Sequence, residues 1–158
     1  MSDRIFPTAQ DAENAFYEAL ERADLEAMMA VWAEDEEIVC VHPTGPRLSG
    51  QDQVRESWTQ IFAGSARVRV HVTKQLVITG MMVAIHSVQE NFTLEGEERG
   101  EQESRQLQGR DSRPAAIVAT NVYLRTAAGW RMIVHHASPA PGQAEHKPSR
   151  EASPKILH

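Results

Sequence analysis

Two residues in the stretch MMVAIHSVQENFTL have the types and the spacing for acid–base chemistry. His86 and Glu90 stand four positions apart where residues alternate as in a β-strand, so both side chains point from one face. A carboxylate in apolar surroundings has a raised pKa and can act as a general acid or base. The competing interpretation is that Glu90 is solvated near the end of the strand and His86 is paired at an interface.

An adjacent pair of histidines, His135 and His136, forms a second candidate for chemistry. Alternation sends the two rings to opposite faces of the predicted strand, so at most one of them belongs to a pocket. His42, which ends the apolar run IVCVH, is a further candidate. No spacing among these histidines matches a known metal-binding pattern, so we expect no metal and no cofactor.

Three helices are predicted ahead of the long strands that carry these residues. Apolar spacing places the first over 11–23, the second over 25–33 with Asp24 as its N-cap, and the third over 50–62. In the first helix, Glu13 falls outside the apolar face with the other charged residues. Trp32 and Trp58 fall on the inner faces of the second and third helices, where a tryptophan is more often core than part of a ligand site.

A period of two predicts strands at 68–78 and 81–94, after a short buried strand at 38–42. The stretch AAIVATNVYLRTAAGWRMIVHHASP then forms a hairpin over 115–139. A four-residue connection pairs Asn121 with Val134 and Val122 with Ile133. Both faces of this hairpin are mostly apolar, so we expect helices or a pocket on one face and a second sheet, for example from another subunit, on the other.

Composition and charge narrow the class of protein. The chain has 158 residues, 41% of them hydrophobic, and a net charge of −6 without a basic stripe, which argues against a nucleic acid partner. No apolar run approaches the roughly 18 to 20 residues that span a bilayer, so no membrane partner is expected. Cys40 is the only cysteine, which favours a reduced, cytoplasmic location.

The polar segments set the expected domain boundaries. The segment 95–113 is nearly all polar, and the residues after 139 are rich in proline and polar side chains. We therefore predict a single domain over 8–139, with flexible arms at 1–7 and 140–158 and a flexible loop at 95–113.

The order of predicted elements resembles the nuclear transport factor two-like superfamily, specifically its SnoaL-like and calcium/calmodulin-dependent kinase association-domain-like bacterial members. Three blocks carry the resemblance: ADLEAMMAVWAEDEEIVCVHPTGPRLSG (23–50), ESWTQIF (56–62) and TNVYLRTAAGWRMIVHHASP (120–139). The resemblance implies an α+β fold, in which three N-terminal helices pack on the concave face of a cone-shaped (cystatin-like), curved, largely antiparallel mixed sheet. It also implies a homodimer formed through the outer face of the sheet.

The same resemblance implies a pocket at the open end of the cone that takes a small apolar ligand. The implied function is an isomerase, dehydratase or cyclase acting on an apolar carbonyl compound, and the alternative is a non-catalytic dimeric binding or assembly module. The residues implied for acid–base catalysis are Glu90, His86 and His136. Those implied for ligand binding are Trp32, His42, Trp58, Asn121, Tyr123 and His135.

The sequence departs from the better-known activities of this superfamily. No aspartate is flanked as a ketosteroid-isomerase base requires, and no arginine-bracketed aspartate of the epoxide-hydrolase kind is found. Tyr17 and Tyr123 are the only tyrosines, so the tyrosine set of scytalone dehydratase is missing. These departures leave the substrate and the reaction open.

Overall fold

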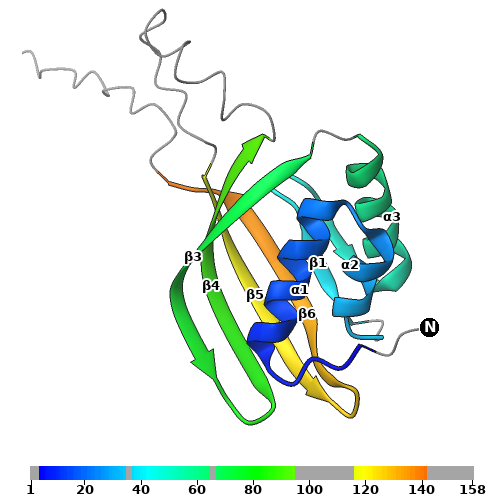
Figure 1. The fold of residues 1–158 in the computed structure, drawn as a ribbon, viewed down its shortest axis with the longest axis vertical. Coiled ribbons are helices and arrows are strands. Elements are labelled where there is room, and N and C mark those ends of the chain that lie inside the picture. Colours follow the sequence, from blue (N-terminus) through cyan, green and yellow to red (C-terminus); the bar gives the residue numbers. More distant parts are fainter. Residues whose placement is uncertain (1–3, 35–36, 65–66, 95–115, 142–158) are drawn as a thin grey trace, which may run out of the picture.

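Three helices cover one face of a six-stranded sheet in this computed structural model, which describes residues 4–34, 37–64, 67–94 and 116–141 (Figure 1). The helices are α1 (Ala9–Arg22), α2 (Leu25–Val31) and α3 (Gly50–Ala63). The strands are β1 (Val39–Val41), β2 (Arg47–Ser49), β3 (Val68–Thr79), β4 (Val83–Leu94), β5 (Ala116–Thr126) and β6 (Gly129–Pro139).

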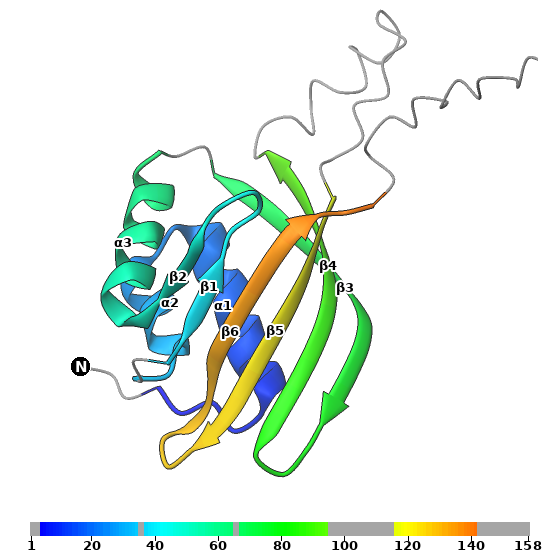
Figure 2. The same ribbon diagram turned by 180° about the vertical axis from the view of Figure 1, so that it is seen from behind.

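The sheet is open and mixed, with the strand order β2-β1-β6-β5-β4-β3. All neighbouring strands are antiparallel except β1 and β6, which run parallel. Seen from behind, the long strands curve around the helices, which lie on the concave side (Figure 2). The predicted α+β class, with helices on the concave face of a curved sheet, is therefore confirmed.

Helix α1 begins two residues earlier than the apolar spacing predicted, because a capping box precedes it. The Thr8 side chain accepts a hydrogen bond from the Asp11 backbone N–H, and the Asp11 carboxylate accepts one from the Thr8 backbone N–H. At the other end, Ala23 adopts a left-handed conformation (φ 51°) and stops the helix. Asp24 caps α2, as predicted, by accepting from the Ala27 N–H.

A β-bulge at Ile133 changes the predicted register of the β5–β6 hairpin. Beyond the bulge, Val122 pairs with Val134 and Asn121 pairs with His135. The predicted pairs of Asn121 with Val134 and Val122 with Ile133 are therefore wrong, because one extra residue shifts the following side chains to the opposite face. Ile133 packs against the core instead.

The corrected register lays an apolar row across the outer face of the sheet. Cross-strand pairs connect the row in the order Ile78, Ile85, Val122, Val134 and Val39. The inner face of the same strands carries the buried core against the helices, where each fully buried large apolar side chain contributes about 1.5–3 kcal/mol. Both faces of the hairpin are thus mainly apolar.

Residues 4–7, predicted to belong to a flexible arm, lie against the β5–β6 turn. Phe6 is only 6% exposed, and its carbonyl accepts from the Trp130 N–H at 2.9 Å. The Arg131 guanidinium lies over the Phe6 ring, 5.0 Å from its centroid. Gly129 has φ +93°, and a Cβ there would come within 2.7 Å of the Phe6 carbonyl oxygen, so this contact requires glycine.

The predicted flexible loop at 95–113, and all but the first two residues of the predicted flexible arm at 140–158, lie outside the described residues. No helix in the described part of the chain is long and apolar enough to cross a membrane.

Candidate functional site

A cavity of about 590 Å³ lies where the last turns of α1 and α3 meet the start of β3 and the end of β4. Its volume falls in the range of roughly 300–1,000 Å³ that is usual for small-molecule sites. Its apolar walls come from seven residues on helices and strands: Leu20, Trp58, Ile61, Phe62, Val68, Phe92 and Ile117. Four lining residues carry groups able to move or accept a proton: Glu21 on α1, and His42, Glu90 and His135.

Glu90 supplies the carboxyl group of this cavity from the inner face of β4. The residue is 3% exposed, and its Oε2 accepts a 2.6 Å hydrogen bond from the Tyr17 hydroxyl on α1. The pKa of Glu90 is raised to about 7, chiefly by burial and to a smaller extent by the negative charge of Glu13, while the Tyr17 hydrogen bond opposes the shift. At neutral pH both the acid and the carboxylate are therefore populated.

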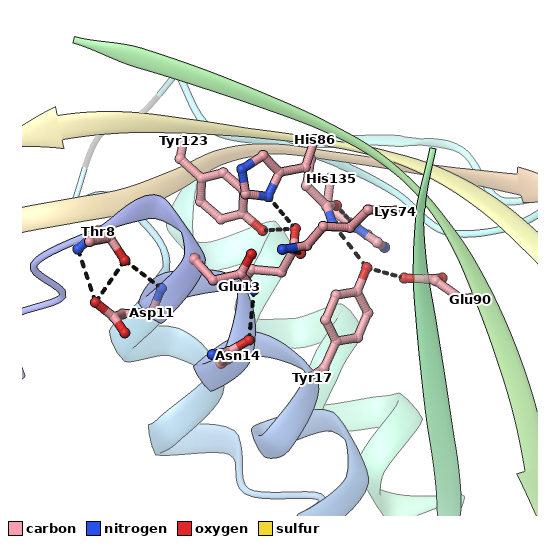
Figure 3. Close-up of polar contacts among 12 residues, drawn as sticks. Thr8, Asp11, Glu13, Asn14, Tyr17, Lys74, His86, Glu90, Tyr123 and His135 are labelled. Atoms are coloured by element: carbon pink, nitrogen blue, oxygen red, sulfur yellow. Dashed lines mark hydrogen bonds and ion pairs between the residues drawn. The ribbon is translucent and has the colours of Figure 1, made fainter. Parts of the chain in front are cut away.

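A directed chain of hydrogen bonds joins Glu90 to His135 (Figure 3). Tyr17 donates to Glu90, and Asn121 Nδ2 donates to the Tyr17 oxygen at 2.9 Å. The amide of Asn121 therefore presents its oxygen to His135, and the 2.6 Å contact is donated by His135 Nδ1. The chain fixes the tautomer of His135 and leaves its Nε2 as an acceptor.

His135 is a neutral imidazole in this setting. Its pKa is lowered to about 3, chiefly by burial and to a smaller extent by the nearby His42 and His136. The ring lines the cavity, and no residue that the structure describes forms a hydrogen bond with Nε2. His135 Nε2 is thus a lone-pair acceptor available to a ligand.

His42 presents a second neutral imidazole to the cavity. Its Nε2 lies 3.1 Å from Ser57 Oγ, and Ser57 Oγ donates its own proton to the Val54 carbonyl at 2.8 Å. With the Ser57 proton on the Val54 carbonyl, His42 Nε2 donates to Ser57, and Cys40 Sγ lies 3.6 Å from the same nitrogen, so Nδ1 is left as an acceptor. Burial lowers the pKa of His42, which keeps the ring neutral, and the ring packs edge-on against Trp58.

A second buried carboxylate, Glu13, lies one turn before Tyr17 on α1 and is the centre of a separate polar cluster (Figure 3). Its Oε2 accepts from the Tyr123 hydroxyl at 3.0 Å and lies 2.7 Å from His86 Nδ1. Lys74 Nζ lies 4.0 Å from Oε1. Glu13 is 2% exposed, so its predicted position outside the apolar face is wrong, because α1 packs this side against polar partners on the sheet.

Four of the residues proposed from the sequence come together at the cavity: Glu90, His42, Trp58 and His135. Glu90 is not solvated near the strand end, because α1 covers it. Of the histidine pair, His135 faces the cavity. Which of the two histidines faces the cavity could not be decided from the sequence, because it depends on the register of β6.

The other five proposed residues do not line the cavity. Asn121 lies behind it and positions His135 and Tyr17, while His86 and Tyr123 are partners of Glu13. Trp32 is buried in the core, and His136 is exposed on the outer face of the sheet, so neither reaches the cavity.

Two residues of the site were missed from the sequence, Tyr17 and Glu13. A signal for them exists, because Ala9, Glu13 and Tyr17 recur at a spacing of four and form a stripe along one side of α1. Because Glu13 and Tyr17 are polar, a search for apolar residues does not detect this stripe. Within the described residues, no group of three or more His, Cys, Asp or Glu side chains could hold a metal ion.

Comparison with known proteins agrees with this fold. The SnoaL-like domain family matches residues 10–142 of the chain, and no curated protein matches it. A candidate calcium/calmodulin-dependent protein kinase type II association domain from Thiobacillus denitrificans is 38% identical (TM-score 0.73), with 87% of this chain and 98% of that chain covered.

Two further solved structures are similar. A candidate dehydratase of the nuclear transport factor two-like family from Streptomyces avermitilis is 31% identical (TM-score 0.66), with 82% of this chain and 91% of that chain covered. A ketosteroid isomerase-like protein from Erwinia carotovora atroseptica is 20% identical (TM-score 0.60), with 82% and 92% covered, and supports the shared fold alone.

Proposed function

The chain belongs to the SnoaL-like domain family, and from this premise we propose that it is a small-molecule enzyme of isomerase or dehydratase type, acting on an apolar carbonyl compound. The observation that carries the proposal is Glu90, a carboxyl group with a pKa of about 7 on the wall of an otherwise apolar cavity. A general acid or base works best when its pKa lies near the operating pH.

Glu90 is the group that moves the proton. Tyr17 occupies Oε2, which leaves Oε1 for the substrate. The carboxylate takes a proton from the carbon beside the carbonyl, the C–H electron pair moves into the enolate, and the carboxyl group is then protonated. Returning this proton to a different carbon completes an isomerisation, and giving it to a β-hydroxyl that leaves as water completes a dehydration.

The two imidazoles orient the substrate. The pKa of His135 is about 3, far below that of Glu90, so Glu90 is the stronger base of the two. His135 Nε2 and His42 Nδ1 instead accept hydrogen bonds from a substrate hydroxyl. Asn121 and Tyr17 hold the His135 ring and the Glu90 carboxyl in place.

Proton exchange tests this function directly. The wild-type chain is incubated in deuterated buffer with a panel of apolar ketones and β-hydroxy ketones, and deuterium at the α-carbon is measured by NMR. We expect exchange with an inflection near pH 7, and a loss of about 10²–10⁴-fold in Glu90→Gln. Glu56→Gln, an exposed carboxylate on α3, is the matched control. Equal exchange in wild type and Glu90→Gln would refute the assignment.

The second candidate function, a non-catalytic dimeric binding or assembly module, is favoured by the outer face of the sheet. The row from Ile78 to Val39 is apolar, and Ile78 itself is 50% exposed. We propose that two copies of the chain pack through this row, with or without catalysis.

Light scattering tests the dimer. Val134→Glu places a charge in the middle of the apolar row and should give a monomer, because an unpaired charge is costly in an apolar interface. Gln60→Glu, on the exposed side of α3, should leave the mass unchanged. A Val134→Glu protein with the wild-type mass would contradict the dimer. A dimer without any proton exchange would favour the assembly module.

A further inference from the structure

Two arginines border the cavity, and among the described residues only Arg22 has a partner. Arg22 Nη1 is bound to Glu18 Oε1 at 3.1 Å on the surface of α1. Arg67 lies just before β3, is exposed, and lines both the cavity and an adjoining groove of about 570 Å³. It forms no hydrogen bond or ion pair with any residue that the structure describes.

None of the carboxylates around this rim forms a hydrogen bond or ion pair with Arg67 in the described part of the chain, and each has another partner. A guanidinium without a partner can bind a carboxylate or a sulfonate through two parallel hydrogen bonds. The carboxylates and their partners are Glu18 with Arg22, Glu21 with the Val70 N–H, Asp24 with the Ala27 N–H, and Glu26 with Arg55.

The inner end of the cavity has the opposite character. His135 Nε2 and His42 Nδ1 present lone pairs, and the ionised form of Glu90 presents a negative charge. An anionic group would be repelled there, whereas a hydroxyl would be bound. The two ends of the cavity therefore select different ends of a ligand.

The strand register gives an approximate length for a ligand that reaches both ends of the cavity. Glu90 pairs with Val72, which is five positions along the chain from Arg67. At a rise of about 3.3 Å per residue, the two backbone positions are about 16 Å apart along the strand direction, and Arg67 and Glu90 both line the cavity. The lining also includes the apolar side chains of Val68 and Phe92.

From this arrangement we propose that the substrate is an elongated apolar compound with a singly charged anionic group, which pairs with Arg67 at the mouth while the reacting carbonyl lies beside Glu90. This assignment rests on the proposed function, because it takes the cavity to be the reaction site. It adds the chemical class of the substrate and its direction of entry.

A matched pair of fluorescent probes tests the anionic group. Anilinonaphthalene sulfonate and phenylnaphthylamine share one ring skeleton and differ in the sulfonate. We expect Arg67→Gln to weaken the sulfonate probe about five- to tenfold, the loss of one partly exposed ion pair, and to change the amine probe less than about twofold. Arg47→Gln, an exposed arginine on β2 away from the cavity, should change neither.

A blocking variant shows where the probes bind. Val68→Trp fills the cavity wall and should weaken both probes, because Val68 lines the cavity. Sulfonate binding that survives Val68→Trp, or that is unaffected by Arg67→Gln, would overturn the proposal. So would an equal loss of both probes in Arg67→Gln.

The outcome can be separated from that of the proton-exchange experiment. An Arg67 effect without proton exchange would retain anion binding and refute catalysis. Exchange without an Arg67 effect would retain catalysis and refute the anionic substrate.

Discussion

Two glutamates on neighbouring elements, Glu13 and Glu90, are almost equally buried and yet have different surroundings. They are 2% and 3% exposed. The Glu13 carboxylate is surrounded by the Tyr123 hydroxyl, His86 Nδ1 and the Lys74 ammonium group. Glu90 accepts from Tyr17 and otherwise faces an apolar cavity. The number of donors around a buried carboxylate, more than its burial, separates a structural group from a reactive one.

Removing Glu13 should have the largest effect. Glu13→Ala leaves His86, Tyr123 and Lys74 without their shared acceptor, and breaking such a buried network costs about 3–5 kcal/mol. Urea unfolding at pH 7 measures the loss. Glu90→Gln is the matched comparison and should lose little stability, since the Gln oxygen still accepts from Tyr17. Equal losses in the two variants would remove the distinction between the carboxylates.

The second prediction concerns pH. The pKa of Glu90 is raised from 4.5 to about 7 in the folded protein, so the folded state holds the proton more tightly than the unfolded state. The corresponding stabilisation, about 3 kcal/mol, is fully present below pH 4.5 and is lost as the pH rises to about 7. Between pH 4 and 8, the free energy of unfolding should therefore fall more steeply with rising pH in wild type than in Glu90→Gln.

The comparison with Glu90→Gln is needed because His135 contributes in the opposite direction. Its pKa is lowered from 6.5 to about 3, so stabilisation present above pH 6.5 is lost as the pH falls towards 3. Both proteins contain His135, so its contribution cancels when their free energies of unfolding are subtracted. Parallel curves over the whole range would contradict a raised pKa for Glu90.

Tyr17→Phe should have a smaller effect, on the reactive carboxylate. The Tyr17 hydroxyl stabilises the ionised form of Glu90, so its loss should raise the pKa of Glu90 and shift the inflection of proton exchange upward by about one pH unit. Tyr123→Phe, which removes a hydroxyl from Glu13, should leave the inflection in place. A shift of the same size in both variants would argue against a separate role for Tyr17.

The smallest effect is expected for Lys74→Met. Lys74 is 39% exposed and its Nζ lies 4.0 Å from Glu13, so the pair should contribute at most about 1 kcal/mol and weaken in salt. Urea unfolding at low and high ionic strength measures the difference. A loss comparable to that of Glu13→Ala would show that Lys74, and not the two hydrogen-bond donors, holds the carboxylate.

Local patterns in the sequence were sufficient for the elements and for part of the site. The spacing of apolar residues located all three helices, and alternation placed His86 and Glu90 on one face of β4. Alternation also separated His135 from His136. These features depend on neighbouring positions in the chain, and local backbone geometry determines them.

Strand β2 and the bulge in β6 were not predicted from the sequence. Strand β2 has three residues, RLS, and a strand so short carries no periodicity. Its place is decided by pairing with β1, where Leu48 lies opposite Cys40. The bulge at Ile133 likewise leaves the apolar run WRMIV looking like a regular strand.

The sequence by itself determined which side chains share a face, while only the tertiary structure decided which of them meet. Tyr17 reaches Glu90, and Glu13 reaches His86, across 73 positions in each case. A spacing of four keeps two residues on one side of both a helix and a strand, so α1 and β4 can each present their pair to the other. Such contacts depend on how a helix crosses a sheet, and packing of the whole core sets that crossing.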